Sequence, residues 1–174
     1  MAGSVTLRPM TEADLHLVSA WLARPHVARW WMEDPDEPAV RQRYLPAITG
    51  ADPTHLVVAE LDGRPIGFAQ WYRWDDEAAA DRRAVSAEPG DVGIDYAIGE
   101  ADACGHGIGT RLIAALIDEV RGHHPGAALL SDPEQANVAS CRVLEKNGFR
   151  LVDVRRIESE PGDGPNAIYR LDPP

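Results

Sequence analysis

The sequence is poor in the features that mark several common classes of protein. Its 174 residues contain only two cysteines, Cys104 and Cys141, which form no CxxC pair and no disulfide framework. We therefore expect no zinc or other metal site, and a reducing, cytoplasmic location is favoured. No apolar run reaches the roughly 20 residues of a membrane span, and the N-terminus lacks a basic stretch followed by an apolar core. Neither membrane attachment nor a signal peptide is expected.

Positive charge is also scarce. The chain has 17 lysine and arginine residues against 28 aspartate and glutamate residues, a formal net charge of −11. Such a surface repels phosphate backbones, so nucleic acid is not an expected partner. It would attract a cation, although net charge by itself is better explained by solubility. The length favours a single domain over residues 1–174 with one sizeable core.

The hydrophobic pattern predicts strands interspersed with helices. Strands are expected at 5–9, 54–61, 65–74, 91–99 and 127–131, and in the closing segments FRLVDVRRI and NAIYRL. Helices are expected at 12–23, 26–32 (a short helix or turn), 39–48, 108–120 and 137–149. Residues 75–90 lack a hydrophobic period and are predicted to be a mobile loop. Together these elements indicate an α+β, or mixed α/β, sheet domain.

A glycine-rich segment, CGHGIGTRL at 104–112, connects a predicted strand to a predicted helix. Such a turn presents free backbone N–H groups and the positive end of the helix dipole, which together favour an anion such as phosphate. A tight turn that needs positive φ explains the glycines equally well. No Gly-Lys-Ser/Thr follows, so the segment is no nucleotide P-loop, and it is a poor dinucleotide fingerprint.

Two segments in this order resemble the GNAT acyltransferases. Residues 107–110, GIGT, resemble the superfamily's Q/R-x-x-G-x-G/A pyrophosphate loop, and residues 137–149 resemble its N-x-x-A-x-x-x-Y-x-K-x-G-F helix. The resemblance implies a central, mostly antiparallel twisted sheet flanked by helices, with a splayed strand pair that holds acetyl-CoA as co-substrate. Two residues depart from the pattern. Cys104 replaces a polar residue of the loop, and Leu144 replaces a tyrosine that in many members protonates the departing thiolate.

Further blocks are similar to the aminoglycoside 6'-N-acetyltransferases over roughly residues 5–170. They are VTLRPMTEADL, RWW, YLP, PIGFAQWY, GID and SDPEQAN. The resemblance implies acetyl transfer to the 6'-amine of aminoglycoside antibiotics, a resistance activity, with a cationic small-molecule amine as partner. We expect a monomer or weak homodimer. Two alternatives remain open: an N-acyltransferase for another amine, such as a siderophore lysine side chain, and a non-catalytic coenzyme A-binding regulatory module.

The same resemblance implies where acetyl-CoA binds. Backbone N–H groups of His106 to Thr110 would hold the pyrophosphate, and the strand at 95–98 would pair with the pantetheine arm and polarise the carbonyl. Asn137 would bind the arm, although asparagine also suits a helix N-cap. The predicted coenzyme A-binding residues are Tyr96, Ala97, Ile98, Gly105, His106, Gly107, Ile108, Gly109, Thr110 and Asn137.

Asp95 is the predicted catalytic base. It shares one strand face with Gly93, Ala97 and Gly99, whose small side chains are expected to leave space for a ligand. A lone aspartate on an alternating strand is more commonly a surface acid, but the GID block matches the catalytic aspartate of the family.

Substrate-binding residues are expected around that base. By resemblance Asp132 would bind a substrate ammonium, although an aspartate before proline also forms turns. Aromatic side chains could wall the amine site or simply pack in the core; they are Trp30, Trp31, Tyr44, Trp71 and Tyr72. Acids in or beside the 75–90 segment could supply a field for a polycation; they are Asp75, Asp76, Glu77, Glu88 and Asp91.

Overall fold

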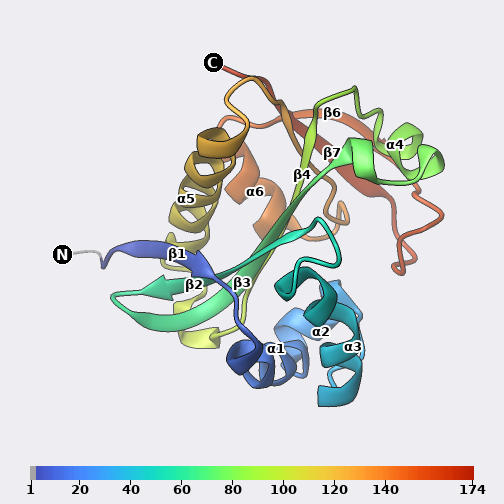
Figure 1. Ribbon diagram of the computed structural model, residues 1–174. Helices are drawn as coiled ribbons and strands as arrows, with labels where there is room; N and C mark the ends of the chain where they lie inside the picture. The colour runs from blue at the N-terminus through green and yellow to red at the C-terminus, as the bar shows by residue number, and fades with distance from the viewer. Residues whose placement is uncertain (1–2) are drawn as a thin grey trace.

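The computed structural model describes residues 3–174, which are built around a seven-stranded sheet (Figure 1). The strand order is β1-β2-β3-β4-β5-β7-β6, and every neighbouring pair is antiparallel except the parallel pair β4–β5. The strands are β1 Val5–Pro9, β2 His55–Leu61, β3 Arg64–Arg73, β4 Val92–Ile98, β5 Leu129–Ser131, β6 Arg150–Arg155 and β7 Asn166–Leu171. The predicted fold class, a mostly antiparallel sheet flanked by helices, is confirmed.

Helices cover both faces of this sheet (Figure 1). They are α1 Leu15–Leu22, α2 Pro25–Trp31, α3 Glu37–Ile48, α4 Ala79–Val85, α5 Ile108–His123 and α6 Val138–Lys146. Strand β2 divides its side chains between the two layers: Leu56 and Val58 pack with α1 to α3, whereas Val57 and Ala59 pack with α5 and α6. Alternation with a period of two therefore gives the sheet two apolar faces.

Signals at the ends of helices explain why most predicted bounds are correct to within three residues. Pro38 lies in the first turn of α3, where its missing N–H group costs no intrahelical hydrogen bond. Asn137 is the N-cap of α6, and its Oδ1 atom accepts a hydrogen bond from the Ser140 backbone N–H at 3.2 Å. Gly107 precedes α5 with a φ of 74°, in the left-handed region that favours glycine.

The prediction of a loop over the whole of 75–90 is wrong, because residues 79–85 form a helix. A short 3-10 turn, Trp74–Asp76, is followed by α4, and the single buried side chain of this helix, Val85, anchors it. Val85 packs with Trp74, Leu130 and Ile168 in a third apolar cluster. A seven-residue helix with one apolar anchor shows no hydrophobic period, which explains why the pattern did not reveal it.

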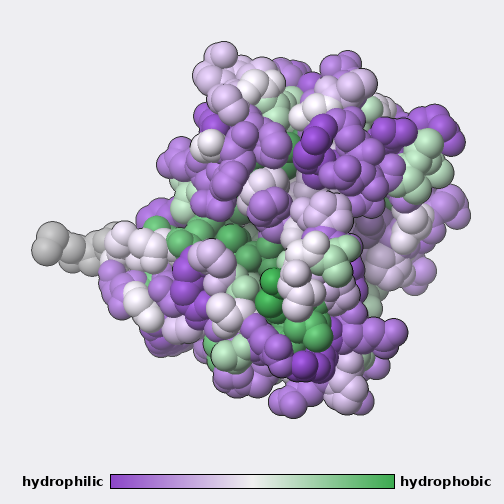
Figure 2. Space-filling view, in the orientation of Figure 1, coloured by the Kyte–Doolittle hydropathy of each residue, from purple (hydrophilic) through white to green (hydrophobic). Residues whose placement is uncertain are grey.

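The surface is largely hydrophilic. Figure 2 shows polar residues over most of the face toward the viewer, with hydrophobic residues gathered in a band across its middle. The large exposed apolar side chains are Met32, Val138, Leu151, Val152 and Val154. Within residues 3–174, no helix combines the length and apolar character that crossing a membrane would require.

Candidate active site

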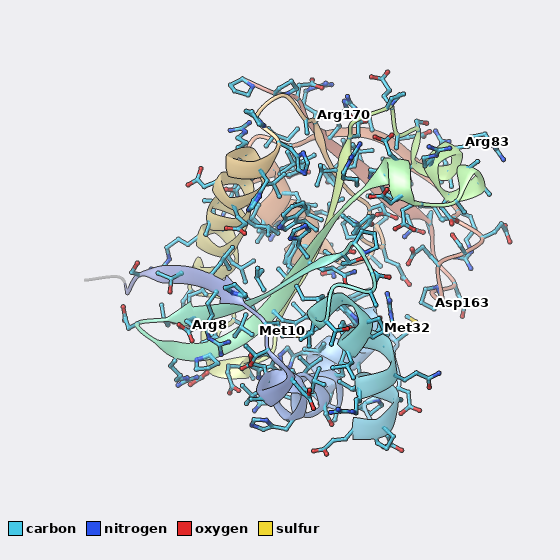
Figure 3. The ribbon with its side chains drawn as sticks, in the orientation of Figure 1. Arg8, Met10, Met32, Arg83, Asp163 and Arg170 are labelled. Carbon is cyan, nitrogen blue, oxygen red and sulfur yellow. The ribbon has the colours of Figure 1, made fainter. Side chains whose placement is uncertain are left out.

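A cleft opens where β4 and β5 separate. These strands pair at Val92–Leu129 and Gly93–Leu130, and within residues 3–174 the rest of β4 has no strand partner on that side. The cleft has a volume of about 530 Å³ and is lined by residues from α2, β3, β4, α6 and the segments that follow β5 and β6. In Figure 3, Met32 marks the end of α2 and Asp163 marks the segment between β6 and β7. The predicted splayed strand pair is therefore present.

The free edge of β4 presents backbone hydrogen-bonding groups toward the cleft. Val92 donates its N–H to Ala128 on the β5 side, whereas Gly99 donates to Ile66 beside β3. Because successive peptide groups of a strand point to opposite sides, the N–H groups of Tyr96 and Ile98 point away from β3, into the gap. The Ile98 carbonyl faces the same gap and lies 3.0 Å from Nε2 of His26. Ala97, by contrast, is buried against α1 to α3.

The glycine-rich loop leads directly into α5. Gly105, His106 and Gly107 are exposed, and no side chain in the described part of the protein caps the start of α5. The first N–H groups of a helix have no intrahelical partners, so those of Ile108, Gly109 and Thr110 are available to an anion. A Cβ atom built on Gly109 would lie 3.2 Å from Val143 of α6 and 3.6 Å from Ile98 of β4. This helix end therefore adjoins the free edge of β4.

Asp95 lines the cleft, and a hydrogen bond from Gln70 orients its carboxylate. Gln70, its register partner on β3, donates from Nε2 to Oδ2 at 2.8 Å. Burial raises the pKa of Asp95 most strongly, and the charge of Glu33 adds to this. The Gln70 hydrogen bond, the charge of Arg43 and a hydrogen bond from Tyr72 oppose the rise without cancelling it. A carboxylate with a raised pKa is a stronger base, and its half-buried position leaves it accessible from the cleft.

The prediction that small neighbours leave ligand space beside Asp95 is wrong at two positions. A Cβ atom on Gly93 would lie 2.4 Å from the Tyr72 ring, and one on Gly99 would lie 2.0 Å from the ring of Trp21. Aromatic rings therefore fill the volume that these glycines leave. The ligand space lies instead along the open edge of β4.

Asp132 follows β5 immediately and also lines the cleft. Burial, together with the charges of Asp95 and Glu160, raises its pKa to about 8. Asn166 donates from Nδ2 to the Asp132 backbone carbonyl at 2.8 Å, which fixes the chain at this point. A positive charge placed beside Asp132 would favour its ionised form.

Acidic side chains dominate the lining of the cleft. Eight carboxyl groups and one basic group, Arg43, contribute to it; the acids are Glu33, Asp52, Glu77, Asp81, Asp95, Asp132, Glu134 and Glu160. Of the five acids predicted near the 75–90 segment, only Glu77 is among them. Asp91 instead forms a buried ion pair with Arg170 at 2.6 Å, and Asp75 pairs with Arg73. A cleft with this charge balance favours a ligand with several cationic groups.

The aromatic side chains divide between the cleft and the core. Trp30, Trp31 and Tyr72 line the cleft, where they could contact a substrate amine. Tyr44 does not: it is buried with α1 to α3, accepts a hydrogen bond from Trp31 and donates one of 2.6 Å to Glu33. Trp71 lies on the opposite face of the sheet, stacked on His55. Tyr44 therefore acts on the cleft by positioning Glu33 and Trp31.

Several lining residues were missed by the sequence reasoning. Gln70 had a visible signal, because it is the one polar residue between Pro65 and Trp71 of the β3 segment. Ser140 stood within the motif at 137–149, at the position of its alanine. Glu33 and Glu160 had no signal, since each comes from a segment remote from β4 in the sequence. Only the folded sheet brings them to the same cleft.

The family of the chain follows from this fold and a sequence match. Residues 10–157 match the Acetyltransferase (GNAT) domain family. The match spans most of the chain and includes the free β4 edge, the loop before α5 and helix α6. The chain belongs to the GNAT acetyltransferase family.

Known relatives narrow the comparison. The chain is 33% identical to an aminoglycoside N(6')-acetyltransferase type 1 of Klebsiella pneumoniae, over 97% of this chain and 82% of the relative. It is 28% identical to the lysine N-acyltransferase MbtK of a Mycobacterium species, over 98% and 68% of the two chains. A crystal structure of the aminoglycoside acetyltransferase AAC(6')-Ib with coenzyme A and kanamycin superposes with a TM-score of 0.81, at 33% identity over 97% and 95% of the chains.

Proposed function

We propose that the protein transfers an acetyl group from acetyl-CoA to the 6'-amine of aminoglycoside antibiotics. The observation that carries this proposal is the position of Asp95. Its half-buried carboxyl group, which has a raised pKa, lies in a cleft lined by eight carboxyl groups and one arginine. Aminoglycosides carry several ammonium groups, which match that charge balance. The similarity to aminoglycoside N(6')-acetyltransferases supports the same substrate class. Two free cysteines support a cytoplasmic location.

The residues along the β4 edge fit an extended acyl-CoA. The N-terminus of α5 suits a pyrophosphate, and the free N–H groups of Tyr96 and Ile98 suit an extended amide-containing arm and a thioester carbonyl. Asn137, whose Oδ1 caps α6, keeps its Nδ2 group for the arm. Acetyl-CoA supplies the activated acyl group, and these residues hold and polarise it.

Asp95 and the acidic residues around it act on the amine. Asp95 accepts a proton from the substrate ammonium, because the neutral amine is the nucleophile. Asp132 holds an ammonium group by charge, while Trp30, Trp31 and Tyr72 offer ring faces to the sugar and its cations. Burial and the charges of Asp95 and Asp132 raise the pKa of Tyr72, so its hydroxyl remains protonated and can donate a hydrogen bond.

Acylation of a lysine side chain is the second candidate, because a lysine N-acyltransferase is among the relatives. Free-thiol release with acetyl-CoA separates the candidates when it is measured with kanamycin, tobramycin, a 6'-hydroxyl aminoglycoside and a lysine derivative. We expect turnover only with the two 6'-amino compounds. Turnover of the lysine derivative alone would favour the second candidate. Binding of coenzyme A without thiol release from any amine would favour a regulatory module.

The role of Asp95 has its own test. Asp95→Asn should retain the Gln70 contact and the fold but lose about 100-fold or more in kcat. Asp172→Asn is the matched control, since Asp172 is an exposed partner of Arg150 remote from the cleft lining. Circular dichroism would verify folding of both variants. Undiminished kcat in Asp95→Asn would contradict the assignment of the base.

A further inference from the structure

Two hydroxyl groups meet inside the cleft at the gap between β4 and α6. Tyr96 Oη and Ser140 Oγ lie 2.6 Å apart, and both residues line the cleft. Tyr96 Oη also lies 3.3 Å from the Ser140 carbonyl, a longer contact. Two hydroxyls that share one hydrogen bond retain a second O–H, and a ligand in the cleft can accept it. Burial raises the pKa of Tyr96, so this group stays protonated across the neutral range.

The hydroxyl pair lies between the two ends of the expected acyl-CoA path. At one end, the start of α5 packs against Ile98 and Val143. At the other end of the path lies Asp95, the proposed base for the amine. Along a strand each residue advances about 3.3 Å, so Ile98 and Asp95 are about 10 Å apart and Tyr96 lies between them. An arm laid along this edge passes the hydroxyl pair just before its carbonyl reaches Asp95.

The reaction creates a negative charge on the sulfur of coenzyme A, and α6 lacks the tyrosine that in many family members would protonate this sulfur. Leu144 replaces the motif's tyrosine and is completely buried, with no polar atom in its side chain. The hydroxyl of Tyr169, also near α6, donates a hydrogen bond to Glu145 at 2.8 Å, and Tyr169 is not part of the described cleft lining. Among the described residues that line the cleft, Ser140 lies on α6 itself and Tyr96 is hydrogen-bonded to it.

We propose that the Tyr96–Ser140 hydroxyl pair donates a hydrogen bond to the sulfur of the departing coenzyme A thiolate. This inference rests on the proposed acetyl transfer and adds a catalytic group to it. A preorganised donor aimed at an atom where charge develops lowers the barrier, because it stabilises the transition state more than the ground state.

The step balances without a further reactant. The carbon–nitrogen bond forms while the carbon–sulfur bond breaks, and the bonding pair leaves on sulfur. The nitrogen loses two protons in all, the first to Asp95 before attack and the second to water afterwards. Tyr96 and Ser140 keep their protons and only share one with the sulfur. Water later returns a proton to the sulfur, and Asp95 passes its own proton to water, which restores the base and releases one proton per turnover.

The test measures the thiol pKa of bound coenzyme A, which needs no amine substrate. A thiolate absorbs ultraviolet light at wavelengths shorter than the adenine band, where the neutral thiol absorbs little, and a pH titration of the coenzyme A complex against the desulfo-coenzyme A complex isolates that signal. We expect Tyr96→Phe to raise the bound thiol pKa by about one to two units and to lower kcat by about 10- to 100-fold. Ser140→Ala should shift both quantities in the same direction by less. Tyr169→Phe is the matched control and should shift neither.

The outcomes separate this inference from the proposed function. An unchanged thiol pKa in both Tyr96→Phe and Ser140→Ala would overturn the inference and leave acetyl transfer intact. If Tyr96→Phe does not fold, the Ser140→Ala titration decides alone. A shifted thiol pKa in a protein that acetylates no amine would support the donor and refute the proposed function. Failure of the unaltered protein to bind coenzyme A would overturn both.

Discussion

Removing the charge of Asp132 should stabilise the protein at alkaline pH. A carboxyl whose pKa is raised by folding binds a proton that the unfolded chain has already released. Stability therefore falls as the pH rises from the unfolded pKa of 3.8 to the folded pKa of about 8. Asp132→Asn keeps the side-chain shape and leaves the backbone contact with Asn166 in place. It removes the titrating group and should remove its share of the pH dependence.

The expected size of the effect follows from the shift. At about 1.4 kcal/mol per unit, a rise from 3.8 to about 8 corresponds to about 6 kcal/mol. The side chain is only half-buried, and water in the cleft reduces this to about 2–3 kcal/mol. In a chain of this length 1 kcal/mol moves the melting temperature by about 2–4 °C. Asp132→Asn should therefore melt about 5–10 °C above the unaltered protein at pH 8 and together with it near pH 4.

Thermal unfolding between pH 4 and pH 8.5, followed by circular dichroism, measures the effect. Asp172→Asn is the control, because Arg150 and Arg170 lower the pKa of Asp172. Asp172 is ionised above about pH 4 in both the folded and the unfolded protein, so its contribution to stability hardly changes above that pH. Asp172→Asn should therefore lose about the same stability at every pH measured. Adding kanamycin at pH 8 should raise the melting temperature of the unaltered protein more than that of Asp132→Asn. Identical pH slopes for Asp132→Asn and the unaltered protein would refute the reasoning.

Two further variants test how the cleft is built. Gly93→Ala places a Cβ atom 2.4 Å from the Tyr72 ring and must displace the ring. We expect this variant to lose about 1–3 kcal/mol in stability and to show a raised KM for the amine. An unchanged KM would argue against Tyr72 as a wall of the amine site. Gly107→Ala meets no atom within 4 Å but adopts a φ of 74°, so a cost of about 1 kcal/mol should distort the start of α5. Calorimetry should then show weaker coenzyme A binding, whereas equal affinity would mean that this helix end does not hold the pyrophosphate.

Local signals in the sequence were sufficient for the framework of the site. Alternation over 91–99 placed Asp95 and Tyr96 on opposite faces of one strand, and the glycines at 105–109 marked the start of α5. Both features depend on neighbours in the chain, which a sequence shows directly. The GNAT motifs then supplied the order of these parts along the cleft.

What fills the space around the strand could not be predicted, because it depends on residues distant in the sequence. The pattern showed that one face of β4 is small, but Trp21 and Tyr72 occupy the room beside Gly99 and Gly93. Likewise Tyr44 looked like a wall of the amine site and instead holds Glu33 from within the core. Composition revealed an acidic chain, but only the fold gathers eight carboxyl groups in one cleft.

The alternation of β4 also resolves a conflict between the two groups proposed for catalysis. A hydroxyl that donates to the catalytic carboxylate competes with the amine for it and lowers its basicity. As neighbours in the chain, Asp95 and Tyr96 project to opposite faces, where Gln70 holds one and Ser140 the other. The reacting carbonyl can lie at the strand edge between them. One extended segment thereby offers a base for the nitrogen and a donor for the sulfur, which do not neutralise each other.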